Sequence, residues 1–357
     1  MSRIDSFLTL VVNQDGSDLH MVAGNPPRIR LYGELVPVKY RELSAEEATD
    51  LIYETMTETV RSAFESRHSL DYAYEMPGVA RFRVNAFRHL GGLGAVLRVI
   101  RTTIRTLDEL NAPPVLKTFC KQKRGLILVT GPTGSGKSTT LAAMVDFINQ
   151  DRKEHIITIE DPVEFVHPQK KCLVSQREIG LNAESFAGAL RSSLREDANV
   201  VMVGELRDLE TIGLAVTAAE TGILVLATLH TNGAVATVDR MVSVFPAAEQ
   251  TLIRSMLSTS LCGVVSQQLL RRIDGKGMVA AVEILVNNAA VANILREGKT
   301  DLLTSVIQSG ALVGMQTLDN SLRHLLDAKL ISGSEAYRKA SNKSAFEQFR
   351  ERDGEPA

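Results

Sequence analysis

The chain has 357 residues, of which 44% are hydrophobic and 23% charged, a composition typical of a folded globular protein with room for two or three hydrophobic cores. Its 40 basic and 42 acidic side chains nearly cancel, so the net charge gives no global reason to bind nucleic acid or an anionic membrane. Three widely spaced cysteines, Cys120, Cys172 and Cys262, argue against a disulfide framework or a zinc-binding Cys pair and indicate a reducing cytoplasm.

The N-terminal segment contains only a short apolar stretch, from Phe7 to Val12, preceded by Asp5. This pattern is not that of a signal peptide. No uncharged apolar run approaches the ~20 residues that a membrane-spanning helix needs. We therefore expect membrane association only through partner proteins.

Residues 1–105 are predicted to form a small α+β domain. Strand-like patterns cover residues 29–38 and 82–87. A helix is predicted from Ser44 to about Ser66, because Ser44 and Glu47 have the spacing of a capping box.

The second half of this domain is rich in arginine. Residues 81–105 contain no acidic residue and six arginines: Arg81, Arg83, Arg88, Arg98, Arg101 and Arg105. Strand alternation alone would leave such side chains solvated on exposed faces. Arginine is also the side chain best suited to bidentate contact with phosphate, so the cluster is a candidate anion-binding surface.

A linker is predicted at residues 106–116, where Pro113 and Pro114 prevent a continuous helix. Residues 117–357 are predicted to form an α/β domain. Short apolar strands at residues 126–130, 156–160, 200–204 and 223–228 alternate with helical patterns, which favours a buried, mainly parallel sheet. Residues 246–341 are predicted to be mostly helical, and residues 351–357 a frayed tail.

The strongest motif follows the first of these strands. Residues 131–138 read GPTGSGKS and match the phosphate-binding pattern GxxxxGK[ST] between a strand and a helix. Lys137 is predicted to contact the β- and γ-phosphates of ATP, and the Ser138 hydroxyl to bind Mg²⁺. The predicted nucleotide-binding residues are Gly131, Pro132, Thr133, Gly134, Ser135, Gly136, Lys137, Ser138 and Thr139.

Acidic residues and a histidine follow the next three strands. The strand at residues 156–159 is followed by three carboxylates, Glu160, Asp161 and Glu164. They either form a solvated turn or take part in Mg²⁺ binding and water orientation. In the second case, Glu160 and Glu164 are the predicted metal ligands. Glu205 follows Gly204, which stands where many such enzymes carry a magnesium-binding aspartate, so Glu205 is predicted to polarise the attacking water. His230 is a candidate γ-phosphate sensor.

In this order, the segments GPTGSGKST, ITIEDPVEF, VMVGELRD and ATLHTN resemble the Walker A, Asp box, Walker B and His box of the bacterial secretion ATPases. Among these, the chain is most similar to the PilT-type retraction ATPases of type IV pili. The likeness extends from GSDLHMVAGNPPRIR near the start to GMQTLDNSL near residue 320. One departure is AVANILRE at residues 290–297, where these ATPases usually carry AIRNLIRE.

The resemblance implies a PAS-like N-terminal domain, a RecA-like ATPase domain and a homohexameric ring on the cytoplasmic face of the inner membrane. It implies an inner-membrane platform protein as partner, with a PilU-like paralogue as a further one. It also implies that N-domain arginines reach the phosphates of bound ATP, with Arg81 and Arg83 as the stronger candidates and Arg88 and Arg98 as the weaker. The implied activity is ATP hydrolysis that powers pilus retraction and twitching motility.

Other readings stay open. A PilU-type accessory ATPase would share the nucleotide motifs, as would an assembly or type II secretion ATPase, which usually carries a longer N-terminal region and a four-cysteine zinc site. A RecA-like nucleic-acid motor is disfavoured by the absence of Trp and the 5% aromatic content. A nucleotide-dependent switch that barely hydrolyses ATP would be distinguished by a phosphate-release assay.

Overall fold

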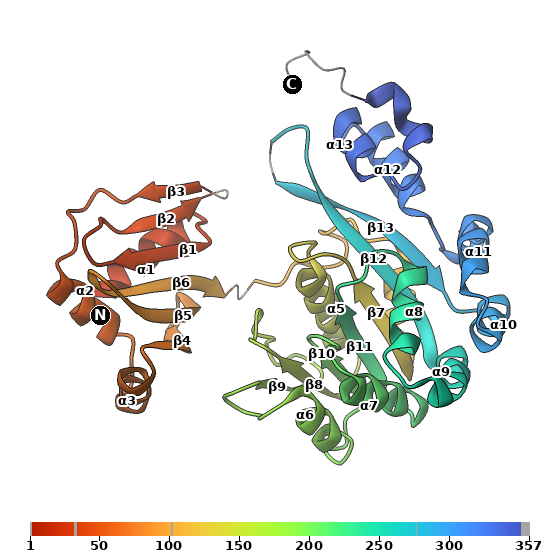
Figure 1. Cartoon of the computed structure of the whole chain (residues 1–357), viewed down its shortest axis with the longest axis horizontal. Coiled ribbons are helices and arrows are strands. Elements are labelled where there is room, and N and C mark those ends of the chain that lie inside the picture. The colour runs from red at the N-terminus through yellow and green to blue at the C-terminus, as the bar shows by residue number, and fades with distance from the viewer. Residues whose placement is uncertain (1, 32–33, 101–102, 276, 351–357) are drawn as a thin grey trace. The chain divides into compact units, whose positions relative to one another are not determined.

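The computed structural model describes residues 2–31, 34–100, 103–275 and 277–350 (Figure 1). It divides into two compact units, Met1–Thr103 with Glu164–Val166, and Ile104–Val163 with His167–Ala357. Arg101 and the predicted frayed tail lie outside the described residues. None of the helices in the described part of the chain combines the length and apolar character that a bilayer span requires.

The first unit is a six-stranded antiparallel sheet with helices. Its strands, in the spatial order β3-β2-β1-β6-β5-β4, are β1 (Asp18–Val22), β2 (Arg28–Leu31), β3 (Glu34–Pro37), β4 (Ser69–Met76), β5 (Ala80–His89) and β6 (Gly92–Ile100). Its helices are α1 (Arg3–Asn13), α2 (Ala45–Tyr53) and α3 (Glu58–Arg67). Alternate residues of β5, including Phe82 and Val84, are fully buried in the core of this unit. The intervening arginines Arg81 and Arg83 are only half-buried.

The single helix predicted from Ser44 to about Ser66 is wrong, because α2 ends at Tyr53 and α3 begins at Glu58. Between them, the Thr55 hydroxyl is buried and lies 2.7 Å from the Ile52 carbonyl oxygen and 2.6 Å from the Tyr72 hydroxyl. These bonds fix a non-helical turn, and the Thr57 side chain then caps α3.

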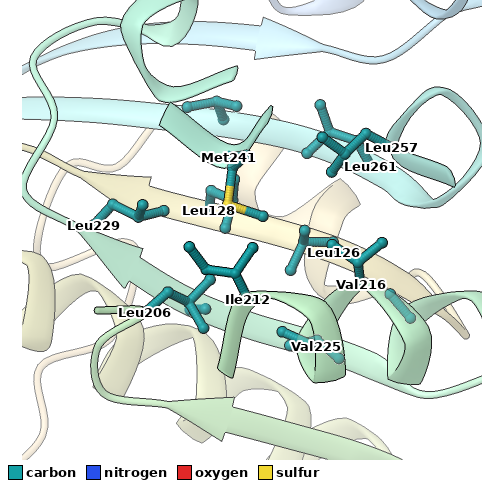
Figure 2. Packing of buried hydrophobic residues seen from close by; sticks show 14 of the residues in the cluster. Leu126, Leu128, Leu206, Ile212, Val216, Val225, Leu229, Met241, Leu257 and Leu261 are labelled. Carbon is teal, nitrogen blue, oxygen red and sulfur yellow. The ribbon is translucent and has the colours of Figure 1, made fainter. Parts of the chain in front are cut away.

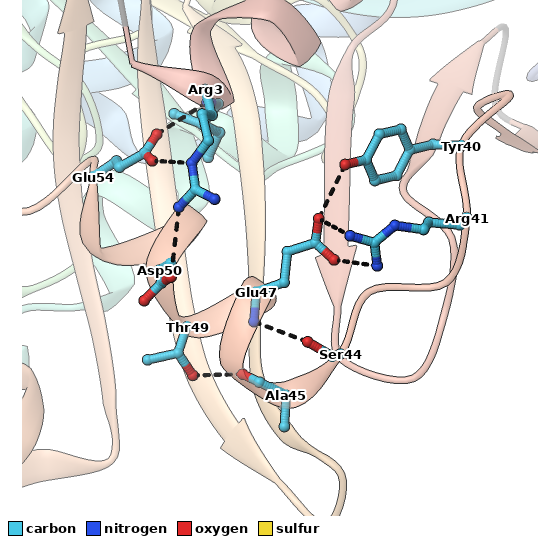
Figure 3. Close-up of polar contacts among 10 residues, drawn as sticks. Arg3, Tyr40, Arg41, Ser44, Ala45, Glu47, Thr49, Asp50 and Glu54 are labelled. Atoms are coloured by element: carbon cyan, nitrogen blue, oxygen red, sulfur yellow. Dashed lines mark hydrogen bonds and ion pairs between the residues drawn. The ribbon is translucent and has the colours of Figure 1, made fainter.

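The predicted capping box at Ser44 is half formed. The Ser44 hydroxyl accepts a hydrogen bond from the Glu47 backbone N–H at 3.1 Å. The Glu47 carboxylate instead pairs with Arg41 at 2.7 Å and accepts a hydrogen bond from the Tyr40 hydroxyl (Figure 3). A cation six residues earlier in the chain therefore outcompetes the backbone N–H of Ser44 for the Glu47 carboxylate.

The second unit is built on a seven-stranded sheet of order β13-β12-β7-β11-β10-β8-β9, in which only the β12–β13 pairing is antiparallel. The strands are β7 (Gly125–Thr130), β8 (His155–Glu160), β9 (Leu173–Glu178), β10 (Val200–Val203), β11 (Leu224–Leu229), β12 (Leu261–Arg271) and β13 (Met278–Val286). The helices are α4 (Val115–Cys120), α5 (Lys137–Asp151), α6 (Phe186–Ser193), α7 (Leu209–Glu220), α8 (Ala234–Ser243), α9 (Ala247–Ser260), α10 (Ala289–Glu297), α11 (Leu303–Ser309), α12 (Leu318–Asp327) and α13 (Gly333–Lys339), with 3₁₀ turns at Thr300–Leu302, Ala311–Val313 and Lys343–Phe349.

Alternate residues of each central strand enter two different cores. On one face of β7, Leu126 and Leu128 pack with α7, α8 and α9, as Figure 2 shows around Ile212. On the other face, Ile127 and Val129 pack with α4 and α5. Burial of each such side chain contributes ~1.5–3 kcal/mol. Burial on both faces explains why these strands are apolar throughout.

The prediction that residues 246–341 are mostly helical is wrong for residues 261–271 and 278–286. These residues form the antiparallel pair β12–β13, and β12 also extends the parallel sheet beside β7. Gly263 permits this packing, since a Cβ at that position would lie 2.3 Å from the Phe119 ring. The pairing partner therefore overrides a locally ambiguous pattern, and helical structure, interrupted after α9, resumes at α10.

Candidate functional site

The predicted phosphate loop, His230, Glu205 and Glu160 follow the carboxyl ends of four neighbouring parallel strands. The strands stand in the order β7, β11, β10, β8, so the four groups lie in a row along one edge of the sheet. Ligands of open α/β sheets bind at this edge. The fold therefore brings together the segments that the motifs singled out.

Glycine is required at the first position of the phosphate loop. Gly131 has φ +140°, and a Cβ there would lie 2.2 Å from the Gln267 carbonyl oxygen. Gly134 and Gly136 also have positive φ, at +78° and +85°. Any other residue at these positions would strain the turn that leads into α5.

The loop ends at the N-terminus of α5, for which Gly136 supplies no side-chain cap. The first backbone N–H groups of a helix have no intrahelical partner, and the helix dipole favours an anion there. Pro132, Thr133 and Gly134 are exposed, Ser135 is buried, and Gly136, Ser138 and Thr139 are half-buried. The predicted loop thus offers accessible donors around one helix end.

Lys137 lies folded against this loop. Its Nζ donates hydrogen bonds to the carbonyl oxygens of Gly131 at 2.9 Å and Pro132 at 3.1 Å. Its Nζ also lies 3.4 Å from His230 Nδ1. The ammonium therefore stands at the mouth of the loop, beside the end of β11.

From Lys137, a chain of polar contacts crosses the strand ends. His230 Nε2 lies 3.2 Å from Glu205 Oε1, and Arg207 Nε donates to Glu205 Oε2 at 2.8 Å. Arg207 Nη1 lies 3.6 Å from Asp161 Oδ2. The hydrogen bond to Glu205 raises the pKa of Arg207 above its usual value, with smaller contributions from the charges of Glu205 and Asp161.

The neighbours of His230 define its tautomer. A lysine ammonium can only donate hydrogen bonds, so His230 Nδ1 accepts from Lys137 and carries no proton. The ring proton is then on Nε2, which faces the Glu205 carboxylate. His230 thus bridges the loop lysine and the glutamate.

Gly204 has a steric reason to replace an aspartate. Its backbone N–H donates to the Ile159 carbonyl at 2.7 Å, and a Cβ at this position would lie 3.2 Å from the same oxygen and 3.4 Å from Glu160 Cα. The close approach of β10 to β8 therefore crowds any larger residue. Glu205 is the carboxylate that this strand end presents.

Glu160 and Asp161 also lie at this edge. Glu160 is buried, and its Oε1 accepts hydrogen bonds from Thr158 Oγ1 at 2.6 Å and Gln176 Nε2 at 3.2 Å. Glu164 is exposed in the loop between β8 and β9, within the segment Glu164–Val166 that groups with the first unit. Its role in metal binding stays a prediction.

Within the described residues, no three His, Cys, Asp or Glu side chains come close enough together to hold a metal ion by themselves. Mg²⁺ that accompanies a nucleotide needs only one or two protein oxygens, because phosphates and water complete its shell. The Ser138 hydroxyl and the Glu160 carboxylate are hard oxygen donors, so these residues fit such an ion.

The arginines of the first unit have distinct surroundings. Arg83 pairs with Asp71 at 3.2 Å, Arg98 donates to the buried Asp18 at 2.7 Å, and Arg88 lies over the Phe64 ring at 5.6 Å.

The Arg81 guanidinium has no hydrogen-bond or ion-pair partner in the part of the chain that the structure describes. Residues 81–105 contain no acidic residue, but Arg83 and Arg98 find carboxylate partners on other strands. The phosphate-binding role of all four stays a prediction.

Two side chains at the site were given no role by the sequence. Gln267 is buried on β12, donates from Nε2 to the Ser135 carbonyl at 2.5 Å, and accepts from the Thr140 hydroxyl at 2.9 Å. Arg207 joins Glu205 to Asp161. Arg207 is visible in the motif ELRD, whereas Gln267 lies in a stretch expected to be helical and gave no signal.

Comparison with known proteins identifies the family. The model of the type II/IV secretion system protein family matches residues 2–339. The chain belongs to this family. It is 51% identical to the type IV pilus retraction ATPase PilT of Pseudomonas aeruginosa PAO1 over 337 residues, which cover 94% of this chain and 98% of PilT.

Two further comparisons bear on the expectations from sequence. The type IV pilus ATPase PilU of Pseudomonas aeruginosa PAO1 is 41% identical over 323 residues, covering 90% of this chain and 85% of PilU. A crystal structure of the pilus retraction motor PilT with bound ADP has a TM-score of 0.91 and 42% identity, covering 98% of this chain and 99% of that one. The predicted resemblance to the PilT-type ATPases is confirmed. The predicted fold class is confirmed as well, a PAS-like α+β domain followed by a RecA-like ATPase domain with a helical C-terminal region.

Proposed function

We propose that this protein is an ATPase that powers retraction of type IV pili, and hence twitching motility. The observation that carries the proposal is the row of Lys137, His230 and Glu205 at the strand ends of a RecA-like sheet. Its relatives include PilT, which has been crystallised with ADP.

In the proposed reaction, the loop and Lys137 grip the β- and γ-phosphates and stabilise the charge that develops on the transferred group. Glu205 polarises the water that attacks the γ-phosphorus in line, and His230 senses the γ-phosphate. Bound Mg²⁺ would neutralise phosphate charge. Ser138 and Glu160 would hold it, together with Glu164 as predicted from sequence. Asp161 anchors the acidic end of the row.

We assign the arginines of the first unit to charge stabilisation during hydrolysis, with Arg81 as the leading candidate. Arg81 is half-buried beside Phe82, so its backbone is fixed by the sheet core while its guanidinium keeps no ion-pair partner within the described residues. An arginine in this state gains more from a phosphate than one already paired with a carboxylate, as Arg83 and Arg98 are.

The working assembly is proposed to be a homohexameric ring at the cytoplasmic face of the inner membrane. It would act on an inner-membrane platform protein, with a PilU-like paralogue as a further partner, and would bind the membrane only through these proteins. Nucleic acid is not an expected partner, and ATP hydrolysis strongly stimulated by DNA would contradict this.

A PilU-type accessory role is the second candidate. It is favoured by one observation: Ala292, half-buried on α10, stands where the motif AIRNLIRE has its first arginine. The higher identity to PilT than to PilU, 51% against 41%, supports the main retraction motor.

A deletion strain of the source bacterium tests the function. Loss of the motor should abolish twitching and leave the cells hyperpiliated, and a Lys137→Ala copy should fail to restore either property although the protein is made at normal levels. Normal twitching in the deletion strain would refute a role as the main motor and favour the accessory one. Rescue by Lys137→Ala would refute ATP-driven action altogether.

A further inference from the structure

Arg207 has a position at the site that its motif does not explain. It lies in the short loop between β10 and α7, and its side chain is 56% exposed. Its Nε donates to Glu205 Oε2 at 2.8 Å, and its Nη1 lies 3.6 Å from Asp161 Oδ2. One guanidinium therefore bridges the carboxylates that follow two neighbouring strands, β10 and β8.

The hydrogen bond from Arg207 matters for Glu205 because the other carboxylate oxygen, Oε1, also has a neighbour. Glu205 Oε1 lies 3.2 Å from His230 Nε2, the ring nitrogen left to donate when Nδ1 accepts from Lys137. With a donor on each oxygen, rotation of the carboxylate about its last torsion is restricted. An exposed ion pair adds little to stability, but here it restricts the plane of the Glu205 carboxylate.

We propose that Arg207 is a positioning residue for ATP hydrolysis, which orients the Glu205 carboxylate through the bridge to Asp161. This inference rests on the proposed role of Glu205 as the group that polarises the attacking water. A carboxylate has about four lone-pair sites, so donors from Arg207 and His230 leave acceptor capacity for a water molecule. Arg207 thus orients the Glu205 carboxylate without occupying all of its acceptor sites.

Arginine suits this role better than lysine. The guanidinium is a planar fork whose separate nitrogens meet Glu205 and Asp161 at the same time. A lysine ammonium can neutralise Glu205 but presents a single point charge, so it would hold the carboxylate less firmly. Arg207→Lys should therefore restore only part of the activity that Arg207→Gln loses.

The test measures steady-state ATP hydrolysis of the purified full-length protein, together with binding of a fluorescent ATP analogue. In Arg207→Gln, kcat should fall by about tenfold or more, since small displacements of a catalytic group cost up to ~100-fold. KM and analogue affinity should change less than about twofold, because a general base contributes to the chemical step rather than to binding. Arg207→Lys should fall between Arg207→Gln and the wild type.

A matched control has the same exposure and the same kind of partner. Arg191 is 54% exposed and pairs with Glu210 across α6 and α7. Arg191→Gln should leave kcat and KM unchanged. A loss equal to that of Arg207→Gln would show that removal of any such ion pair impairs the protein, and would overturn the positioning role.

A double-mutant cycle separates positioning from a merely structural effect. If Arg207 acts only through Glu205, adding Arg207→Gln to Glu205→Gln should produce no further loss of kcat. Additive losses would overturn the proposal, as would wild-type kcat in Arg207→Gln while Glu205→Gln is inactive. Wild-type activity in Glu205→Gln would instead refute the assignment of Glu205, so the two failures are distinguishable.

Discussion

Gln267 is predicted to hold the phosphate loop in its binding conformation. In Gln267→Leu, the Ser135 carbonyl loses a donor at 2.5 Å and the Thr140 hydroxyl loses an acceptor at 2.9 Å. Each buried polar group left unsatisfied costs ~1–3 kcal/mol, so the unfolding free energy of the nucleotide-binding unit should fall by ~2–6 kcal/mol. Release of the loop should also weaken ATP binding by about tenfold or more, the equivalent of ~1.4 kcal/mol.

The assays are denaturant unfolding and titration with a fluorescent ATP analogue. Gln267→Glu should weaken binding as well, because it keeps an acceptor for Thr140 but faces the Ser135 carbonyl with a carboxylate oxygen. The matched control is Gln268→Leu, since the Gln268 side chain makes no hydrogen bond to any described residue. If Gln267→Leu binds ATP and unfolds like Gln268→Leu, the brace between β12 and the phosphate loop has no energetic role.

Three further predictions concern the loop, a buried histidine and an arginine. Gly131→Ala should abolish binding of the ATP analogue while the chain stays folded by circular dichroism, because its Cβ would meet the Gln267 carbonyl at 2.2 Å; normal affinity would contradict this. Burial lowers the pKa of His167 from 6.5 to about 4, with Lys170 acting in the same direction and Asp146 opposing it. Between pH 6.5 and pH 4 the unfolded chain therefore binds a proton at this residue that the folded chain does not. The free energy of unfolding should fall as the pH is lowered across that range. Relative to His167→Gln, the wild type should lose up to about 3 kcal/mol across that range in denaturant titrations, and a constant difference would refute it. Arg81→Gln should lower kcat by about tenfold or more, on the scale of lost transition-state contacts, with Arg67→Gln as an unaffected exposed control, and equal rates for the two would remove Arg81 from the reaction.

The parts of the fold that could be predicted are those determined by residues close together in the sequence. The apolar strands beside the loop are buried on both faces, so their hydrophobic runs are continuous and easily recognised. The loop itself depends on glycines whose positive φ values no other residue adopts cheaply, which is why GPTGSGKS was sufficient to place Lys137 at a helix N-terminus. The row of Glu160, Glu205 and His230 then follows from strand order alone.

The remaining features depend on contacts that are distant in sequence. The sequence of β12 favours helix as much as strand until the segment pairs with β7, and its Gln267 is 132 residues from the Ser135 that it holds. The break after α2 depends on Thr55 meeting the Tyr72 hydroxyl. Arg98 looked free of acidic partners because Asp18 lies 80 residues earlier in the chain.

The central claim is that Lys137 grips the phosphates while Glu205 activates water, so binding and hydrolysis belong to different residues. The most direct measurement is single-turnover phosphate release from Mg-ATP by the Glu205→Ala protein, with analogue binding measured on the same sample. The account predicts near-normal binding and a release rate reduced by about 100-fold or more, the contribution of a general base. Release at the wild-type rate would contradict it.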